Sequence, residues 1–186
     1  MGTVNVALLV VVVVIVILAI IFIVWWIKTS NNFIRTDVKV AESLSGIEVA
    51  LTKRFDMLTK LRDTAQSYAA HEKALFVELV TLRKGMSVSE LTQANTQAND
   101  LMARINAVAE NYPQLRSSEV YVELERGIMD AEEHLQAARR LYNSNVTQYN
   151  TMVRVFPSSI VANSKRLSVK EFFEAEDAKR ADVPIR

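Results

Sequence analysis

The stretch VALLVVVVVIVILAIIFIVWWI, residues 6–27, decides how this chain is organised. All 22 residues are apolar. A helix of that length rises about 33 Å, enough to cross a hydrocarbon layer of roughly 30 Å. Trp25 and Trp26 close the run, and tryptophan is typical of the interface between membrane and water. The sequence therefore predicts one transmembrane helix over residues 6–27.

A cleaved signal peptide is the main alternative for this run. It would need a basic stretch before the apolar core, a shorter core, and small residues at a cleavage site. Residues 1–5 contain no Lys or Arg, and the run is too long and ends in two tryptophans. The pattern favours a retained anchor, with Trp25, Trp26 and Lys28 at the membrane interface.

Basic residues appear only after the apolar run, and this predicts the orientation of the anchor. Lys28, Arg35 and Lys39 follow the run, and Lys and Arg preferentially stay on the cytoplasmic side. We expect residues 1–5 to form a short extracytoplasmic N-terminus and residues 28–186 to lie in the cytoplasm.

The composition of the chain predicts long helices and excludes several kinds of site. The 186 residues carry a net charge of +1 and include no cysteine, two histidines, four glycines and three prolines. Without cysteine there is no disulfide, thiolate metal site or cysteine nucleophile. So few helix breakers allow few turns, and no segment alternates long enough for a strand. We therefore expect an all-α fold.

Apolar spacing predicts that residues 28–157 form an elongated antiparallel helical bundle on the membrane helix. The first helix either begins at a cap near residues 29–31 or runs straight out of the membrane. We expect a weak point at Gly46 and a turn near residues 56–60. The apolar positions of this first helix are Ile34, Val38, Ala41, Leu44, Leu51, Phe55 and Leu58.

Three further helices follow from the same spacing. The second contains Leu61, Leu79 and Leu82 and ends at Lys84-Gly85, a basic last turn followed by a C-cap glycine. The third begins with a capping box of Ser87 and Glu90, and Asn111-Tyr112-Pro113 stops it. The fourth runs from Tyr121 to Phe156 with apolar residues three and four apart, and Pro157 ends it. For the C-terminal tail, residues 158–186, we expect packing or partial disorder.

The chain contains a series of recognisable motifs, IEVALTKRFDML at 47–58, YAAHE at 68–72, YPQLR at 112–116, ELE at 123–125, ARRLYN at 138–143, YN at 149–150 and FP at 156–157. With these motifs the chain resembles the LemA family, from the membrane helix to about Ala162. The resemblance implies a bacterial cytoplasmic-membrane protein with one N-terminal membrane helix, a cytoplasmic helical bundle and no established enzymatic activity. Thr59-Lys60 replaces the family's usual Pro-Asn, so the first two helices could be continuous.

The sequence offers no constellation for catalysis. His71-Glu72 begins like a zinc-protease helix, but Leu75 stands where the second histidine is required. Ala131 stands three residues before His134, where a carboxylate bundle site needs glutamate. We therefore expect no catalytic residue, metal, cofactor, small-molecule substrate or nucleic acid. The dispersed basic pairs Lys53-Arg54, Arg139-Arg140 and Lys165-Arg166 are typical of solvated faces.

The pairs Tyr142-Asn143 and Tyr149-Asn150 form a candidate packing or interaction ridge. They are seven residues apart, so they lie on nearly one face of a helix. The tyrosines would pack while the phenol and amide groups bond facing helices, or the ridge would recognise a partner. The first interpretation is favoured.

Two functions fit these observations. The leading hypothesis is a membrane-anchored, non-enzymatic scaffold that forms homo-oligomers and organises membrane or protein partners through its helical rod. The alternative is an accessory or sensor subunit of a membrane protease or signalling complex, in which the bundle binds a membrane protein partner. Both place the chain in the lipid bilayer.

Overall fold

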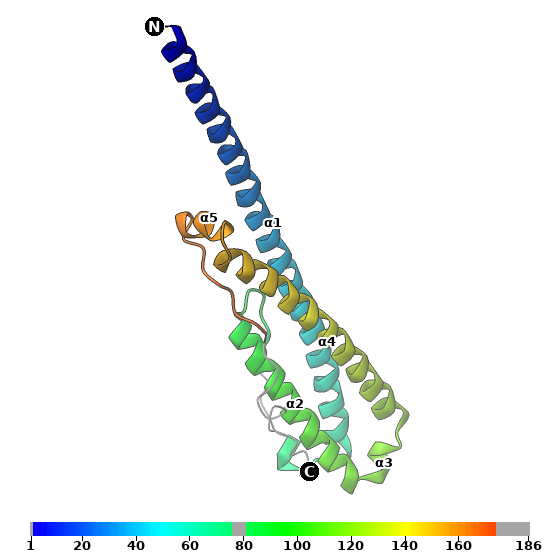
Figure 1. Ribbon diagram of the computed structural model, residues 1–186. Helices are drawn as coiled ribbons and strands as arrows, with labels where there is room; N and C mark the ends of the chain where they lie inside the picture. The colour runs from blue at the N-terminus through cyan, green and yellow to red at the C-terminus, as the bar shows by residue number, and fades with distance from the viewer. Residues whose placement is uncertain (1, 76–80, 174–186) are drawn as a thin grey trace, which may run out of the picture. The chain divides into compact units, whose positions relative to one another are not determined.

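The computed structural model describes residues 2–75 and 81–173, with side chains from Leu9 onward (Figure 1). Within these ranges the chain is helical and contains no strand, which confirms the predicted all-α class. One long apolar helix begins the chain, also as predicted. The elements are α1 Gly2–Tyr68, the 3-10 turn η1 Lys73–Leu75, α2 Val88–Asn111, α3 Pro113–Arg116, α4 Glu119–Arg154 and α5 Ser158–Ser164.

The chain divides into two compact units, and α1 and α4 contribute to both. Residues up to Val40, together with Thr147–Lys170, form the first, which we call the juxtamembrane unit. Residues Ala41–Val146, together with the chain from Glu171 onward, form the second, the bundle unit. Each unit is described separately below.

Helix α1 continues without interruption from the apolar run to Tyr68. The helix passes without a break through Gly46, the predicted bend or weak point, and the expected turn near residues 56–60 is wrong. One glycine in a helix costs about 1 kcal/mol, and the fully buried Ile47 and Leu51 nearby offset it. Thr59 and Lys60 are compatible with a helix, so nothing in the sequence forces a stop there. The helix therefore runs straight out of the apolar segment.

The face that α1 buries after the apolar run differs from the predicted stripe. Ile34 and Val38 are 58% and 59% exposed, so their assignment to the core was wrong. The buried positions are Phe33, Thr36 and Val40, which are also three and four residues apart. The apolar pattern did not identify this face because Thr36, one of its three positions, is polar. Its hydroxyl donates to the carbonyl of Asn32 at 2.9 Å, so it can be buried without losing a hydrogen bond.

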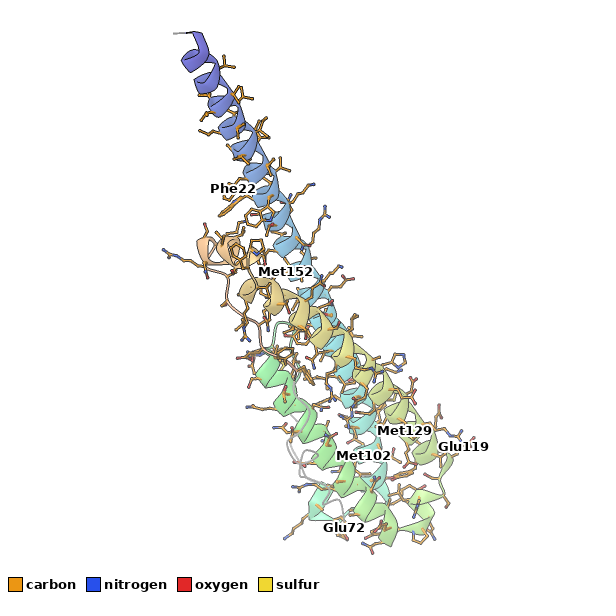
Figure 2. All side chains as sticks on the ribbon, in the orientation of Figure 1. Phe22, Glu72, Met102, Glu119, Met129 and Met152 are labelled. Carbon is orange, nitrogen blue, oxygen red and sulfur yellow. The ribbon has the colours of Figure 1, made fainter. Side chains whose placement is uncertain are left out.

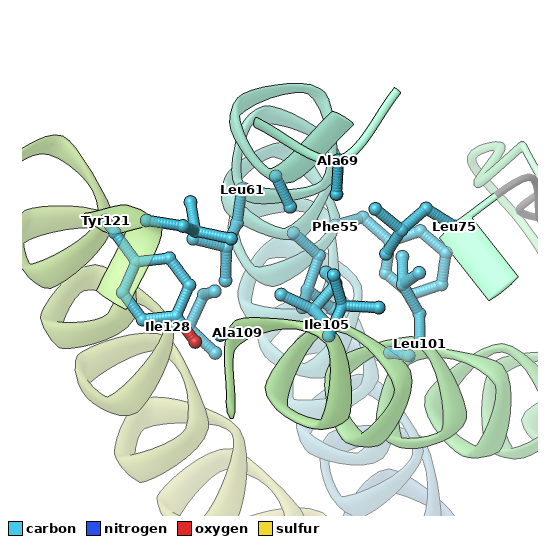
Figure 3. Packing of buried hydrophobic residues seen from close by; sticks show 14 of the residues in the cluster. Phe55, Leu61, Ala69, Leu75, Leu101, Ile105, Ala109, Tyr121 and Ile128 are labelled. Atoms are coloured by element: carbon cyan, nitrogen blue, oxygen red, sulfur yellow. The ribbon is translucent and has the colours of Figure 1, made fainter. Parts of the chain in front are cut away.

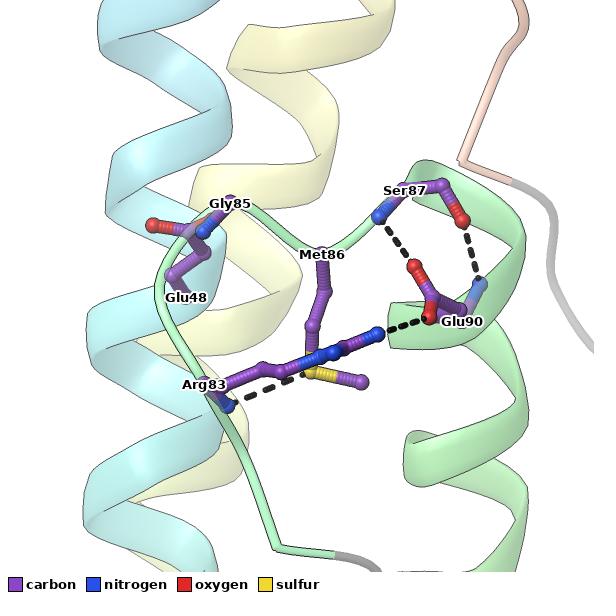
Figure 4. A network of polar contacts seen from close by, with 6 residues as sticks. All are labelled: Glu48, Arg83, Gly85, Met86, Ser87 and Glu90. Carbon is purple, nitrogen blue, oxygen red and sulfur yellow. Dashed lines mark hydrogen bonds and ion pairs between the residues drawn. The ribbon is translucent and has the colours of Figure 1, made fainter.

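The second predicted helix ends much earlier than Lys84-Gly85, because helical structure stops at Tyr68. Leu75 still enters the core, but from the short turn η1. Leu79 lies outside the described residues. Gly85 has φ +82°, a conformation that glycine adopts readily. Its N–H donates to the carboxylate of Glu48 at 3.2 Å, beside the start of α2 (Figure 4).

The predicted start of α2 is confirmed. The N–H of Glu90 donates to the hydroxyl of Ser87 at 3.2 Å, and the N–H of Ser87 donates to the Glu90 carboxylate at 2.7 Å (Figure 4). The guanidinium of Arg83 also contacts this carboxylate at 3.0 Å. The backbone N–H of Ser87, its hydroxyl and Arg83 lower the pKa of Glu90. The helix ends at Asn111, the first residue of the predicted stop.

The bundle unit is built around one apolar cluster (Figure 3). Phe55, Leu58 and Leu61 of α1 meet Leu101 and Ile105 of α2 in this cluster, and Tyr121 and Ile128 of α4 complete it. Burial of this apolar surface, at about 25 cal/mol per Å², is the main favourable term for folding.

Helix α4, Glu119–Arg154, agrees with the predicted heptad pattern over most of its length, but it ends before the predicted Phe156, which is 76% exposed and not part of the buried face. The helix ends at Arg154, and the bond between Phe156 and Pro157 is cis. Helix α5 follows and buries Val161 and Ala162. The chain then runs without regular structure to Phe173, whose side chain is buried. The tail is therefore packed as far as the structure describes it.

Candidate functional site

The apolar part of α1 exposes its side chains all around the helix. From Leu9 to Val24 every large apolar side chain is about half exposed or more, and Figure 2 shows them projecting on all sides. Such a surface is unfavourable in water and favourable in lipid. The segment has the length and composition of a membrane anchor.

The end of this anchor carries an aromatic cluster. The ring of Phe22 lies 5.7 Å from that of Trp25 and 6.0 Å from that of Trp26, measured between centroids. Both tryptophans are partly buried, and Lys28 beyond them is exposed. The three residues predicted for the membrane interface thus lie within about one turn of α1.

Tyr142, Asn143 and Asn150 hydrogen-bond the chain's own tail, where facing helices were expected, and Tyr149 packs against Phe33 of α1. Within the juxtamembrane unit, Asn150 donates to the carbonyl of Lys170 at 2.9 Å and accepts from its N–H at 2.8 Å. Within the bundle unit, Asn143 makes the same pair of bonds with Phe173, at 3.0 and 2.9 Å. Each amide side chain satisfies one backbone donor and one backbone acceptor, as a neighbouring strand would.

The two tyrosines support the same tail segment. Tyr142 donates its hydroxyl to the carbonyl of Glu171 at 2.9 Å. Tyr149 packs edge-on against Phe33 at 6.0 Å, and the Lys170 ammonium lies 5.1 Å from its ring centroid. Burial raises the pKa of both tyrosines. Sequence reasoning found these four residues but not their partner, because the tail lacks a helical pattern.

A buried charge in the bundle unit escaped the sequence reasoning. Arg54 belongs to a pair predicted to lie on a solvated face, yet it is only 5% exposed. Its guanidinium donates to Asn95 at 2.6 Å and Asn99 at 2.5 Å, and it lies 3.1 Å from the carboxylate of Glu132. The polar face of α2 around residues 92–99 was the feature of the sequence that could have indicated a buried polar partner for Arg54.

Lys53, the neighbour of Arg54, does lie on a solvated face. It pairs with Asp130 at 2.5 Å, and both side chains are about half exposed. The hydrogen bond from Lys53 lowers the pKa of Asp130. His134 also contacts Asp130 and is exposed, and so is His71. Across the described residues, no three histidine, aspartate or glutamate side chains gather as a metal site would require.

The fold defines the class of this protein. A long apolar helix runs directly into an all-α body, which is the architecture of a membrane-anchored helical-bundle protein. The LemA family model matches residues 43–186, so the chain belongs to the LemA family. This confirms the resemblance seen in the sequence motifs.

Two relatives match most of the chain. Protein LemA of Metamycoplasma hominis is 24% identical over 163 residues, covering 85% of this chain and 74% of that protein. Magnetosome protein MamQ of Magnetospirillum gryphiswaldense is 21% identical over 185 residues, covering 83% of this chain and 67% of that protein. Together with the apolar helix, these matches indicate a membrane-associated protein of this family.

Proposed function

We propose that this protein is a non-enzymatic membrane scaffold that self-associates and organises membrane or protein partners through its helical body. The supporting observation is an exposed apolar face on α1 that begins at the last residue of the membrane anchor and continues beyond it. Ile27, Ile34 and Val38 are 52%, 58% and 59% exposed. They are seven and four residues apart, the spacing of a coiled-coil seam.

A second copy of the chain is the occupant that fits this face. Copies anchored in one bilayer share a direction and a depth, so Ile34 of one copy meets Ile34 of the next. Confinement to the membrane also raises the effective concentration of each copy for the other. The non-enzymatic part of the proposal is supported by the sequence, which has no cysteine and has Leu75 and Ala131 at the positions where His71 and His134 would need a second ligand.

The size of the full-length protein in mild detergent and in lipid discs tests self-association. We expect a large, regular homo-oligomer by mass measurement and imaging. Ile34→Ser/Val38→Ser should reduce it to monomers, with at least tenfold weaker association and an unchanged melting temperature because both side chains are exposed. Val120→Ser/Met129→Ser removes two exposed apolar side chains of α4 and should leave the oligomer intact.

Two results would contradict this proposal. One is a double serine variant that keeps the mass of the wild type. The other is a wild-type monomer that co-purifies with one different membrane protein, and this result would favour the accessory-subunit alternative.

We also propose that the N-terminus lies outside and that residues 28–186 lie in the cytoplasm of a bacterial cell, at its inner membrane. The basic residues that follow the anchor support this orientation. Protease added to intact spheroplasts should leave residues 28–186 uncut, while protease added after lysis should digest them. Digestion in intact spheroplasts would reverse the proposed topology.

A further inference from the structure

We infer that the juxtamembrane unit contains a binding site for the phosphate group of an anionic phospholipid, with Lys28 and Arg35 as its cationic ligands. The inference depends on the membrane anchor and not on self-association. It goes beyond general attraction to the bilayer, because it assigns the contact to one groove.

The groove lies directly beyond the membrane anchor. Its volume is about 680 Å³, and its walls come from α1, the last turn of α4 and the first residue of α5. Lys28 and Arg35 are seven residues apart on α1, so both point to the same side, about 10 Å apart along the axis. Hydroxyl and amide groups lie between and opposite them. The lining residues are Lys28, Thr29, Asn31, Asn32, Arg35, Met152 and Ser158.

Among the residues that the structure describes, the two cations in this groove have no paired counter-charge. Neither Lys28 nor Arg35 forms an ion pair with any residue that the structure describes. The juxtamembrane unit contains one acidic residue, Asp37. Its carboxylate is already 2.8 Å from the ammonium of Lys170. An anion from outside the chain can therefore pair with Lys28 and Arg35.

Positive charge is concentrated in this unit and is not a property of the whole chain. Residues 1–40 and 147–170 include seven basic residues and one acidic residue. Residues 41–146 and 171–186 include 15 basic and 20 acidic residues. The net charge of the whole chain is only +1 because the excess of basic residues in one unit is offset by the excess of acidic residues in the other. A positive patch at the end of a membrane helix attracts anionic headgroups within about a Debye length.

Exposed apolar side chains beside the groove favour a lipid over a free anion. Val155, Phe156 and Ile160 flank Ser158, and Phe156 is 76% exposed. Apolar side chains next to basic ones are typical of segments that insert into the membrane interface. A phospholipid supplies both a phosphate for the cations and acyl chains for these side chains, whereas inorganic phosphate supplies only the first.

Trp25 and Trp26 provide a built-in probe of the site. They are the only tryptophans in the chain, and they lie within a turn of Lys28. The full-length protein is reconstituted in phosphatidylcholine discs that contain brominated phosphatidylglycerol or brominated phosphatidylcholine at equal mole fractions. Bromine quenches tryptophan at short range, so selective binding appears as stronger quenching by the anionic lipid.

We expect phosphatidylglycerol to be preferred in the wild type. Each cation contributes about fivefold to the affinity, so Lys28→Gln/Arg35→Gln should reduce the preference about 25-fold. The matched control is Lys165→Gln/Arg166→Gln, which removes two exposed charges of the same unit from outside the groove. This control should keep most of the preference.

Three results would overturn the inference. Equal quenching by both lipids in the wild type would show that there is no selective site. An equal loss in the two double variants would show that the preference comes from diffuse charge and not from the groove. Loss of the preference in millimolar inorganic phosphate, at constant ionic strength, would make the groove a site for free anions. Retention of the preference in phosphate supports the lipid.

Discussion

Arg54→Met is expected to lower the free energy of unfolding by about 3 kcal/mol, measured by urea denaturation of the full-length protein in detergent. Arg54 is almost completely buried and contacts three polar side chains, those of Asn95, Asn99 and Glu132. Methionine fills a similar volume but cannot donate a hydrogen bond. The carboxylate and the two amides then each lose the contact that Arg54 makes, although Gln136 still donates to Glu132 at 2.6 Å. Removing a hydrogen-bond partner from a buried polar group destabilises the fold. Glu132 is about one-third exposed, so we place the effect at the lower end of the usual range.

Two further variants separate this effect from a general loss of charge. Lys53→Met removes the neighbouring cation, whose pair with Asp130 is solvent-exposed, and should cost less than about 1 kcal/mol. Arg54→Met/Glu132→Met removes both members of the buried pair and should be more stable than Arg54→Met alone. If Arg54→Met costs no more than Lys53→Met, the buried cluster does not stabilise the fold.

The parts of the fold that were predictable from the sequence carry strong local signals. The anchor follows from 22 consecutive apolar residues. The start of α2 follows from the reciprocal bonds of Ser87 and Glu90, which need only four neighbouring residues. Pro113 and Pro157 mark helix ends because proline restricts the residue before it. None of these features depends on distant parts of the chain.

The parts that were not predictable depend on tertiary packing. Nothing local distinguishes the buried Thr36 from the exposed Ile34, because the choice is made by what packs against α1. Arg54 is a similar case, since its three partners come from α2 and α4, 41 to 78 residues away in the sequence. The continuity of α1 was also undecided, because Gly46 and Thr59 permit a helix without requiring one.

The Tyr-Asn pairs show how far a site could be predicted. The repeat at seven residues placed all four side chains on one face, as the structure has them on α4. Their partner is a tail segment without regular structure, for which hydrophobic periodicity gives no signal. Backbone groups are the bonded atoms, so the side chains of the tail do not reveal the contact. The sequence therefore identified the four residues of the site but not the tail segment that they bind.

Asn143→Ala/Asn150→Ala is expected to release this tail. The two amides make four hydrogen bonds to backbone groups of Lys170 and Phe173. At about 0.5–1.5 kcal/mol for each bond, the double variant should be less stable by about 2–6 kcal/mol. Hydrogen exchange gives the sharper measurement, because the N–H groups of residues 170 and 173 donate to the two asparagines. Their exchange should accelerate at least tenfold.

Asn145→Ala is the matched control for this prediction. Asn145 is on the same helix and donates to the hydroxyl of Ser43 at 3.2 Å, so its loss should leave exchange at residues 170 and 173 unchanged. The opposite result is equally informative. If the double variant melts like the wild type, keeps slow exchange in the tail and loses a binding partner, the four residues form a recognition surface. Because the amides cannot bind the tail and a partner with the same atoms, the two measurements decide between the interpretations.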